Sequence, residues 1–322
     1  MSDKIKWGVI GTANIARTCT IPAMLKAKNC ELYGIASRTL AKAEEFRGIF
    51  GFKKAYGSYE ALLDDPEIQA VYIPLPNHMH KEWVIKAAKK KKNILCEKPL
   101  SGTPADVQEM IDACDREGVI FMEAFAYLHS PAIKSIRQKI AEGAIGEVTV
   151  IETTFITPGY TDDIRIKRET LGGAVYDLGC YNISMILGIL GEEPMEVGAS
   201  AHFNGEHIDD FTTAYLSFPS GVKASVFCAM CSGRRGDRVV VYGTKGTLFS
   251  DIRFNQEGTL TYRIVRDDSV ETVTVDTPDN YTLEIEQLGR CITDGEKPFV
   301  THQMSMTFAR TIEKVLRACN YY

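Results

Sequence analysis

The stretch that decides the fold of the first part of this chain is Lys4-Ile5-Lys6-Trp7-Gly8-Val9-Ile10-Gly11-Thr12-Ala13-Asn14-Ile15-Ala16. A strand-like run ends at Gly11 and a helical pattern follows, which is the context of a dinucleotide-binding loop. Read as G-x-G-x-x-A from Gly11, the motif carries Ala13 in place of its middle glycine. Gly11 can still take the tight turn, and Ala16 is small enough for close packing of helix on strand. We expect the cofactor to contact Gly11 at this turn, and its pyrophosphate to be received by the backbone amides of Thr12, Ala13, Asn14 and Ile15. A loop without a ligand is the alternative.

The first third of the chain alternates strand-like runs with helical ones. The expected strands are Lys4–Ile10, Glu31–Ser37, Ala70–Pro74, Asn93–Cys96 and Val119–Glu123. Strands that alternate with helices in this way predict a doubly wound parallel sheet. We therefore expect an α/β Rossmann domain over residues 1–124.

Past Phe125 the pattern changes to long alternating runs. The expected strands are Val148–Phe155, Phe211–Phe218, Val222–Met230, Val239–Tyr242, Thr259–Val265 and Val270–Val275. Turns at Pro219-Ser220-Gly221 and Thr244-Lys245-Gly246 predict antiparallel, largely sequential pairing. We expect an α+β domain over residues 125–322, used for substrate binding and oligomerisation, with a large, open, mainly antiparallel sheet. Whether the C-terminal helix packs back on the first domain is left open.

Composition excludes several function classes. The 322 residues carry a net charge of −5 and 45% hydrophobic content, which argues against nucleic acid or an anionic membrane as a partner. We see no signal peptide and no apolar stretch that we expect to span a bilayer, so the expected location is cytoplasmic. Nine scattered cysteines are typical of reduced thiols. We expect no metal, because Cys228 and Cys231 would face opposite sides of a strand.

The run Cys96-Glu97-Lys98-Pro99-Leu100 places a lysine directly after an expected buried strand. Ligands of open α/β sheets bind outside the carboxyl ends of the strands, so Lys98 is expected to face cofactor and substrate. A lysine in a surface turn is the alternative.

The end of the second expected strand indicates which dinucleotide is used. An acidic residue normally holds the ribose hydroxyls of NAD there, whereas this chain has Ser37 and Arg38. A hydroxyl and a guanidinium suit a 2′-phosphate, so NADP is favoured over NAD. The alternative is that Arg38 stacks on adenine or faces solvent.

A second loop, Pro74-Leu75-Pro76-Asn77-His78-Met79-His80, is stiffened by two prolines. Asn77 or His78 is expected to cap the next helix beside the cofactor. We favour capping and cofactor contact over metal binding by His78 and His80, because no carboxylate or cysteine clusters with them.

Together, several motifs resemble the Gfo/Idh/MocA oxidoreductase family. They are the opening strand and loop, Pro76-Asn77-x-x-His80, Glu97-Lys98-Pro99, Gly172-Gly173-Ala174-x-x-Asp177-x-Gly179-Cys180-Tyr181 and Tyr242-Gly243-Thr244-Lys245-Gly246. Cys180-Tyr181 and Leu75-Pro76-Asn77-His78 are similar to the branch with dimeric dihydrodiol dehydrogenase, NADP-dependent xylose dehydrogenase and glucose-fructose oxidoreductase. The resemblance implies that Leu75, Pro76, Asn77, His80, Glu97 and Lys98 contact the cofactor. It also implies a homo-oligomer, either dimer or tetramer.

The resemblance further implies that Lys98 is the catalytic lysine, that Asp177 lies in the substrate pocket, and that Tyr181 stands where many relatives have histidine. Asp177 and Tyr181 would share one helix face. Alcohol oxidation needs a base, a positive charge for the alkoxide and a nicotinamide. We assign Tyr181 as acid or base, Lys98 as alkoxide stabiliser and Asp177 as an orienting group.

Further substrate contacts are expected from Arg165 and Tyr127. Arg165 matches a pocket-side position of the branch, with a solvated arginine as the alternative. Tyr127 lies just past the last expected strand of the first domain, where Leu128 replaces the arginine usual in relatives.

Three functions remain open at this point. The first is an NAD(P)-dependent dehydrogenase or reductase of a secondary alcohol or aldehyde in a sugar-like polyol. The second is an enzyme that retains NAD(H) and uses transient oxidation for glycoside cleavage or epimerisation. The third is a non-catalytic, cofactor-binding regulator.

Overall fold

The computed structural model describes residues 4–322, which form two compact units. One unit contains the chain up to His129 together with Asp279–Met306, and the other contains Ser130–Pro278 and Thr307–Tyr322. From the sequence we expected one domain over residues 1–124 and a second over residues 125–322. The boundaries of independently folding domains stay a prediction. By its contacts, helix α8 (Asn280–Asp294) belongs to the first unit.

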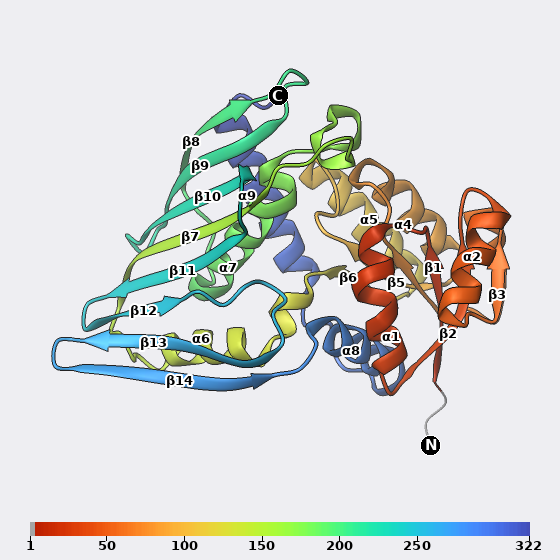
Figure 1. The fold of residues 1–322 in the computed structure, drawn as a ribbon, viewed down its shortest axis with the longest axis horizontal. Helices are drawn as coiled ribbons and strands as arrows, with labels where there is room; N and C mark the ends of the chain where they lie inside the picture. The colour runs from red at the N-terminus through yellow and green to blue at the C-terminus, as the bar shows by residue number, and fades with distance from the viewer. Residues whose placement is uncertain (1–3) are drawn as a thin grey trace. The chain divides into compact units, whose positions relative to one another are not determined.

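The first unit is built on a six-stranded sheet in the order β3-β2-β1-β4-β5-β6 (Figure 1). Its strands are β1 (Ile5–Ile10), β2 (Cys30–Ala36), β3 (Lys54–Tyr56), β4 (Ala70–Ile73), β5 (Asn93–Glu97) and β6 (Phe121–Ala124). All neighbouring pairs are parallel. This is the strand order of a dinucleotide-binding Rossmann fold, so the predicted α/β class is confirmed. The sequence analysis missed only β3, whose three residues lack a buried stripe.

Helices of the first unit begin largely where local chemistry predicts. They are α1 (Ile21–Lys26), α2 (Leu40–Phe50), α3 (Tyr59–Leu63), α4 (His80–Lys89), α5 (Pro104–Glu117) and α8. Thr39 caps α2 and Thr103 caps α5, each accepting a backbone N–H three residues on. The expected cap of α4 by Asn77 or His78 is wrong, because Met79 occupies that position without a side-chain bond.

The second unit contains an eight-stranded sheet in the order β14-β13-β12-β11-β7-β10-β9-β8. Its strands are β7 (Val148–Pro158), β8 (Glu196–Phe203), β9 (Asp209–Ser217), β10 (Lys223–Ser232), β11 (Gly236–Gly243), β12 (Gly246–Ser250), β13 (Gly258–Arg266) and β14 (Ser269–Thr277). The predicted large, mainly antiparallel sheet is confirmed. The pairing is largely sequential, as predicted, except that β7 lies between β11 and β10 and pairs with β10 in parallel.

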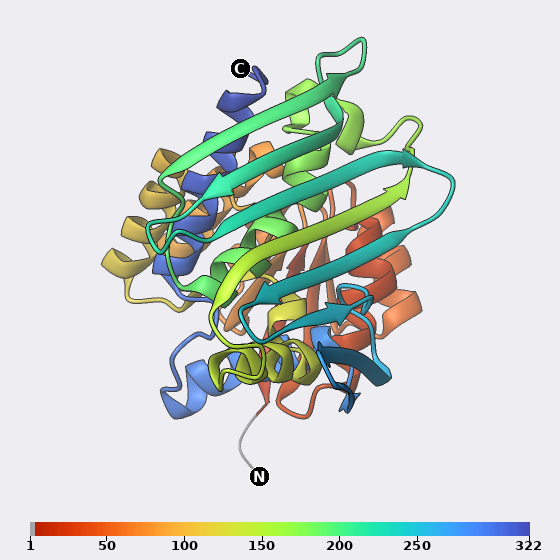
Figure 2. The ribbon, with the colours of Figure 1, turned by 90° about the vertical axis from the view of Figure 1, so that its left-hand side faces the viewer.

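Helices α6 (Pro131–Ala141) and α7 (Cys180–Leu190) belong to this unit. Figure 2 shows the sheet in front, with α7 behind β7 and β10. With the turns before it, α7 forms a helical run over Arg168–Leu190 that is long and apolar enough to cross a membrane, by length and composition alone. We had expected no stretch of the chain to meet this criterion. Since 72% of its most apolar window is buried inside the protein, the run also fits the core helix of a soluble protein.

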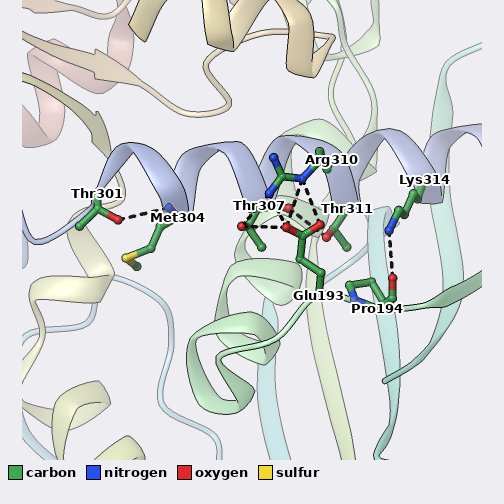
Figure 3. A network of polar contacts seen from close by, with 8 residues as sticks. All are labelled: Glu193, Pro194, Thr301, Met304, Thr307, Arg310, Thr311 and Lys314. Atoms are coloured by element: carbon green, nitrogen blue, oxygen red, sulfur yellow. Dashed lines mark hydrogen bonds and ion pairs between the residues drawn. The ribbon is translucent and has the colours of Figure 1, made fainter. Parts of the chain in front are cut away.

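The last helix, α9 (His302–Ala318), is anchored within the second unit by a polar network (Figure 3). Arg310 Nε donates to both carboxylate oxygens of Glu193, at 3.2 and 3.0 Å, and Thr307 donates to the same carboxylate. Lys314 Nζ donates to the carbonyl of Pro194 at 2.9 Å. Phe308, Ile312, Val315 and Leu316 form the buried apolar stripe of this helix.

Candidate active site

Gly11 joins β1 to the following helix with a positive φ of 115°, a conformation that favours glycine. A Cβ atom there would also meet Leu75 Cδ2 at 3.0 Å. The helix begins at Asn14, and the bond from Arg17 N–H to Ala13 O is the first of its i→i−4 ladder. The amides of Asn14, Ile15 and Ala16 therefore have no partner inside the helix, which suits the pyrophosphate of a dinucleotide.

The loop is tied to the end of β2 by a contact between hydroxyl groups. Thr12 Oγ1 lies 3.3 Å from Ser37 Oγ, and Ser37 is buried. Arg38, the next residue, is exposed. Since no carboxylate stands at this strand end, the residues present fit a phosphorylated ribose better than two free hydroxyls.

Lys98 follows β5 at the same edge of the sheet, because all six strands run parallel and the ends of β1, β2, β4 and β5 lie next to one another. The ring of His80 packs against the loop that carries Lys98. The His80 ring is fully buried, with Nε2 2.7 Å from Leu75 O and Nδ1 3.0 Å from Pro99 O. Burial lowers the pKa of His80 to about 4, so the neutral ring has one N–H and donates to only one of these two carbonyls. This placement favours a positioning role for His80 over direct contact with the cofactor.

Acidic groups gather beneath the Lys98 loop. Tyr72, fully buried on β4, donates to Glu97 Oε1 at 2.5 Å and accepts from the hydroxyl of Thr20 at 3.0 Å. Leu100 N–H donates to Glu123 Oε1 at 3.3 Å. Burial raises the pKa of Glu123 to about 7, and the charge of Lys98 is one of the influences that oppose this rise. Burial and the Glu97 charge raise the pKa of Glu284 well above its ordinary value.

Sequence reasoning missed Tyr72 and Glu284 because each lies inside an element assigned to the core. A tyrosine in a short apolar strand and a glutamate within an amphipathic helix are ordinary in the sequence. To identify them as neighbours of Glu97, one must know that β4 pairs with β5 and that α8 belongs to the same unit.

In the second unit, Arg165 and Asp177 form an ion pair. Arg165 Nε donates to Asp177 Oδ2 at 2.9 Å, and Nη1 donates to Asp163 Oδ1 at 3.1 Å. The Gly172-Gly173 pair allows the backbone to pass close to Arg165, since a Cβ on Gly172 would lie 2.4 Å from Arg165 O. Gly173 N–H donates to that same carbonyl at 2.9 Å. The two glycines therefore fold the chain back so that the next helical turn presents Asp177 to the guanidinium.

Tyr181 lies in the first turn of α7 between two phenylalanine rings. The centroids of Phe155 and Phe254 are 5.4 and 5.1 Å from that of Tyr181, in edge-on and tilted arrangements. Aromatic pairs at such separations attract one another beyond simple burial. The ring of Tyr181 is therefore held from two directions, while its residue remains partly exposed.

The remaining predicted site residues all lie in the first unit. Pro76, Asn77 and Glu97 are partly exposed in the first unit, and Leu75 is buried there. Tyr127, also in the first unit, is fully buried against Phe125. A buried side chain is a weaker candidate for substrate contact, so the role of Tyr127 stays a prediction. Within residues 4–322, no group of three histidine, cysteine or acidic side chains is arranged to hold a metal ion.

Two hollows of about 340 and 220 Å³ lie along β12 and β13 of the second unit. Phe249, Asp251 and Arg263 line both of them. Neither is lined by Asp177 or Tyr181. We place the candidate site by its chemistry, because neither hollow is lined by the nucleotide loop, by Lys98 or by Tyr181.

Known proteins resemble this chain along nearly all of its length. Residues 5–125 match the model of the oxidoreductase family with an NAD-binding Rossmann fold, and residues 133–249 match the GFO/IDH/MocA C-terminal domain. D-xylose 1-dehydrogenase (NADP(+)) 2 of Haloferax volcanii is 36% identical over 315 residues, covering 96% of this chain and 95% of the relative. Trans-1,2-dihydrobenzene-1,2-diol dehydrogenase of Xenopus laevis is 33% identical over 76% of this chain and 74% of its own.

Among solved structures, KijD10, a 3-ketoreductase from Actinomadura kijaniata in complex with NADP and TDP-benzene, superposes with a TM-score of 0.93. It is 29% identical, and the match covers 98% of both chains. These relatives are dehydrogenases and reductases, so the chain is an NAD(P)-dependent oxidoreductase. With family models matched in both parts of the chain, the protein belongs to the Gfo/Idh/MocA family.

Proposed function

We propose that this oxidoreductase uses NADP to interconvert a secondary alcohol or aldehyde group and its oxidised or reduced counterpart on a sugar or sugar-like polyol. The observation that carries the proposal is the position of Lys98 at the carboxyl end of β5, at the sheet edge that also bears Gly11 and Ser37. Named relatives that act on xylose, on a cyclic diol and as a 3-ketoreductase support the substrate class.

Each catalytic role follows from the chemistry of the side chain. The ammonium group of Lys98 neutralises negative charge on the substrate oxygen, and the phenol of Tyr181 gives or takes the proton of that oxygen. Asp177, already paired with Arg165, orients the substrate hydroxyls. NADP, when bound, supplies or accepts the hydride.

The preference for NADP rests on the end of β2. Ser37 and Arg38 replace an acidic residue, and Arg38 is exposed and available to a 2′-phosphate. The xylose dehydrogenase relative is named for NADP, and the 3-ketoreductase was solved with it. Cytoplasmic location and a homo-oligomeric state remain predictions.

A substrate panel tests the proposal. Purified protein is mixed with NADP or NAD and with D-xylose, other aldoses, deoxy-keto sugars and cyclic trans-diols, and the absorbance of the reduced cofactor is followed. We expect turnover with at least one polyol and a higher kcat/KM with NADP than with NAD. Lys98→Ala and Tyr181→Phe should each lower kcat by about 10²- to 10⁴-fold, whereas Lys90→Ala, on the exposed end of α4, should not.

Two outcomes would contradict the proposal. The first is an absence of turnover across the panel, and the second is unchanged kcat in Lys98→Ala. Stoichiometric dinucleotide released from the denatured protein, with no net redox turnover, would instead favour the enzyme class that retains its cofactor.

A further inference from the structure

Asp237, at the start of β11 in the second unit, is a carboxylate whose side chain is 1% exposed. Burying a charged carboxylate is costly unless it is paired and hydrogen-bonded. Here Arg235 Nε donates to Oδ1 at 2.8 Å, and Arg235 Nη2 donates to Oδ2 at 2.7 Å. The two-point geometry is the strong form of a carboxylate–guanidinium pair. A carboxylate buried this deeply and paired with a partly exposed arginine calls for an explanation beyond surface charge.

The same pair fixes the backbone of Phe254. Its N–H donates to Asp237 Oδ2 at 2.8 Å, and its carbonyl accepts from Arg235 Nη2 at 3.0 Å. Phe254 lies in the irregular segment between β12 and β13. Outside a strand or helix, its two backbone groups are thus satisfied by one ion pair, which holds the segment at a defined place.

The guanidinium of Arg235 also supports the second ring beside Tyr181. Its central carbon is 4.8 Å from the centroid of Phe155, which is a favourable cation–π separation. Phe155 and Phe254 are 5.2 Å apart and both contact Tyr181. One ion pair therefore contacts both residues whose rings pack against Tyr181.

We infer that Arg235 and Asp237 are positioning residues for Tyr181, acting through Phe155 and Phe254. The inference rests on the proposed function, because a defined phenol direction matters only if Tyr181 transfers a proton. Displacement of a reacting group by about 1 Å can cost about 100-fold in rate, so a clamp of this kind serves catalysis. Neither residue needs to touch the substrate.

A spectroscopic test separates this inference from the proposed function. Position 181 is labelled with 3-fluorotyrosine, and the ¹⁹F spectrum is recorded for the otherwise unaltered protein, for Arg235→Lys and for Arg238→Lys. Lysine keeps the charge but lacks the planar fork. The control, Arg238, lies on β11 three residues after Arg235, and its ion pair with Glu152 at 3.5 Å is exposed. We expect Arg235→Lys alone to shift the resonance toward its position in the unfolded chain.

Activity supplies the second measurement. With the best substrate of the panel, Arg235→Lys and Phe254→Leu should each lower kcat by about 10- to 100-fold and displace the pH–rate profile, while the affinity for NADPH stays within about twofold. Phe254→Tyr, which keeps an aromatic ring, should restore most of the rate. Arg235→Lys should cause little further loss in a Tyr181→Phe background, because the two changes act on one group.

An unchanged ¹⁹F resonance in folded Arg235→Lys, as judged by circular dichroism, would overturn the inference. So would an equal loss of rate from Arg235→Lys with and without Tyr181. Full activity in Tyr181→Phe would instead overturn the proposed role of Tyr181, whatever the spectrum shows.

Discussion

The phenol of Tyr72 donates a 2.5 Å hydrogen bond to Oε1 of Glu97, the residue directly before Lys98. Tyr72 is fully buried, and Thr20 donates to the same phenol oxygen. A side chain in the middle of the sheet is thereby connected to the loop that carries the proposed catalytic lysine.

Replacing this phenol tests the connection. Tyr72→Phe removes a bond to a charged group, which is worth about 1.5–3 kcal/mol, and leaves Thr20 without its acceptor. We expect the free energy of unfolding, measured by urea denaturation, to fall by about that amount and kcat to fall with it. Tyr59→Phe is the control, because its ring packs edge-on against Trp83 at 4.9 Å and should retain that contact. Equal stability of the two variants would contradict the prediction.

Cofactor preference should depend on Arg38. Arg38→Ala removes a guanidinium from the end of β2, and a charge-assisted bond to phosphate is worth about 1.5–3 kcal/mol, or about 10- to 100-fold in affinity. We expect the Kd for NADPH to rise by that factor and the Kd for NADH to change little, measured by fluorescence titration. Arg47→Ala is the matched control, since Arg47 is also exposed nearby and pairs with Glu44. A parallel loss for both dinucleotides would show that Arg38 does not recognise the 2′-phosphate.

The pair of Arg165 and Asp177 should govern substrate use. Asp177→Asn leaves the guanidinium of Arg165 with only Asp163 as its carboxylate partner among those described above. We expect kcat/KM to fall by about 100-fold, through both kcat and KM, because orientation of the substrate is lost. Arg165→Lys should give a smaller loss, since charge is kept without the Nε donor.

The control for this site is Lys167→Ala. Lys167 lies two residues further on and pairs with the exposed carboxylate of Asp162 at 3.1 Å, a contact of little energetic value. Its steady-state kinetics should match those of the unaltered protein. If Lys167→Ala and Asp177→Asn lose activity equally, the loop as a whole matters and the specific pair does not.

The sequence predicted the fold more completely than the site, for physical reasons. The turn at Gly11 and the caps Thr39 and Thr103 are local, so the residues that cause them lie within a few positions. The insertion of β7 between β11 and β10 depends on pairing between segments far apart in the chain, and alternation alone cannot encode it.

The same distinction explains which site residues were found. Lys98 and Asp177 belong to short motifs, whereas the positioning role proposed for Arg235 and Asp237 depends on Phe254 being brought beside Phe155. His80 shows the converse case. Its motif was recognised, yet its ring is buried between two loops, a fact that depends on the fold rather than on the motif.

The last prediction concerns the pH dependence of stability and the buried carboxyl of Glu123. Burial raises its pKa from 4.5 to about 7, so the folded chain holds this proton more tightly than the unfolded chain. The contribution of Glu123 to stability is therefore complete below about pH 4.5 and is lost as the pH rises to about 7. A difference of this size corresponds to about 3 kcal/mol.

Glutamine at this position mimics the protonated acid and can still accept from Leu100 N–H. Relative to the unaltered protein, Glu123→Gln should therefore gain about 3 kcal/mol in unfolding free energy between pH 4.5 and pH 8. Urea denaturation at several pH values measures the difference, and comparing two proteins cancels the opposite pH dependence of His80 and His129, whose pKa values burial lowers to about 4. Glu44→Gln, exposed on α2, should show no such trend. A constant difference between Glu123→Gln and the unaltered protein would mean that the pKa of Glu123 is the same in the folded and the unfolded chain, so that Lys98 and the hydrogen bonds to Glu123 balance its burial.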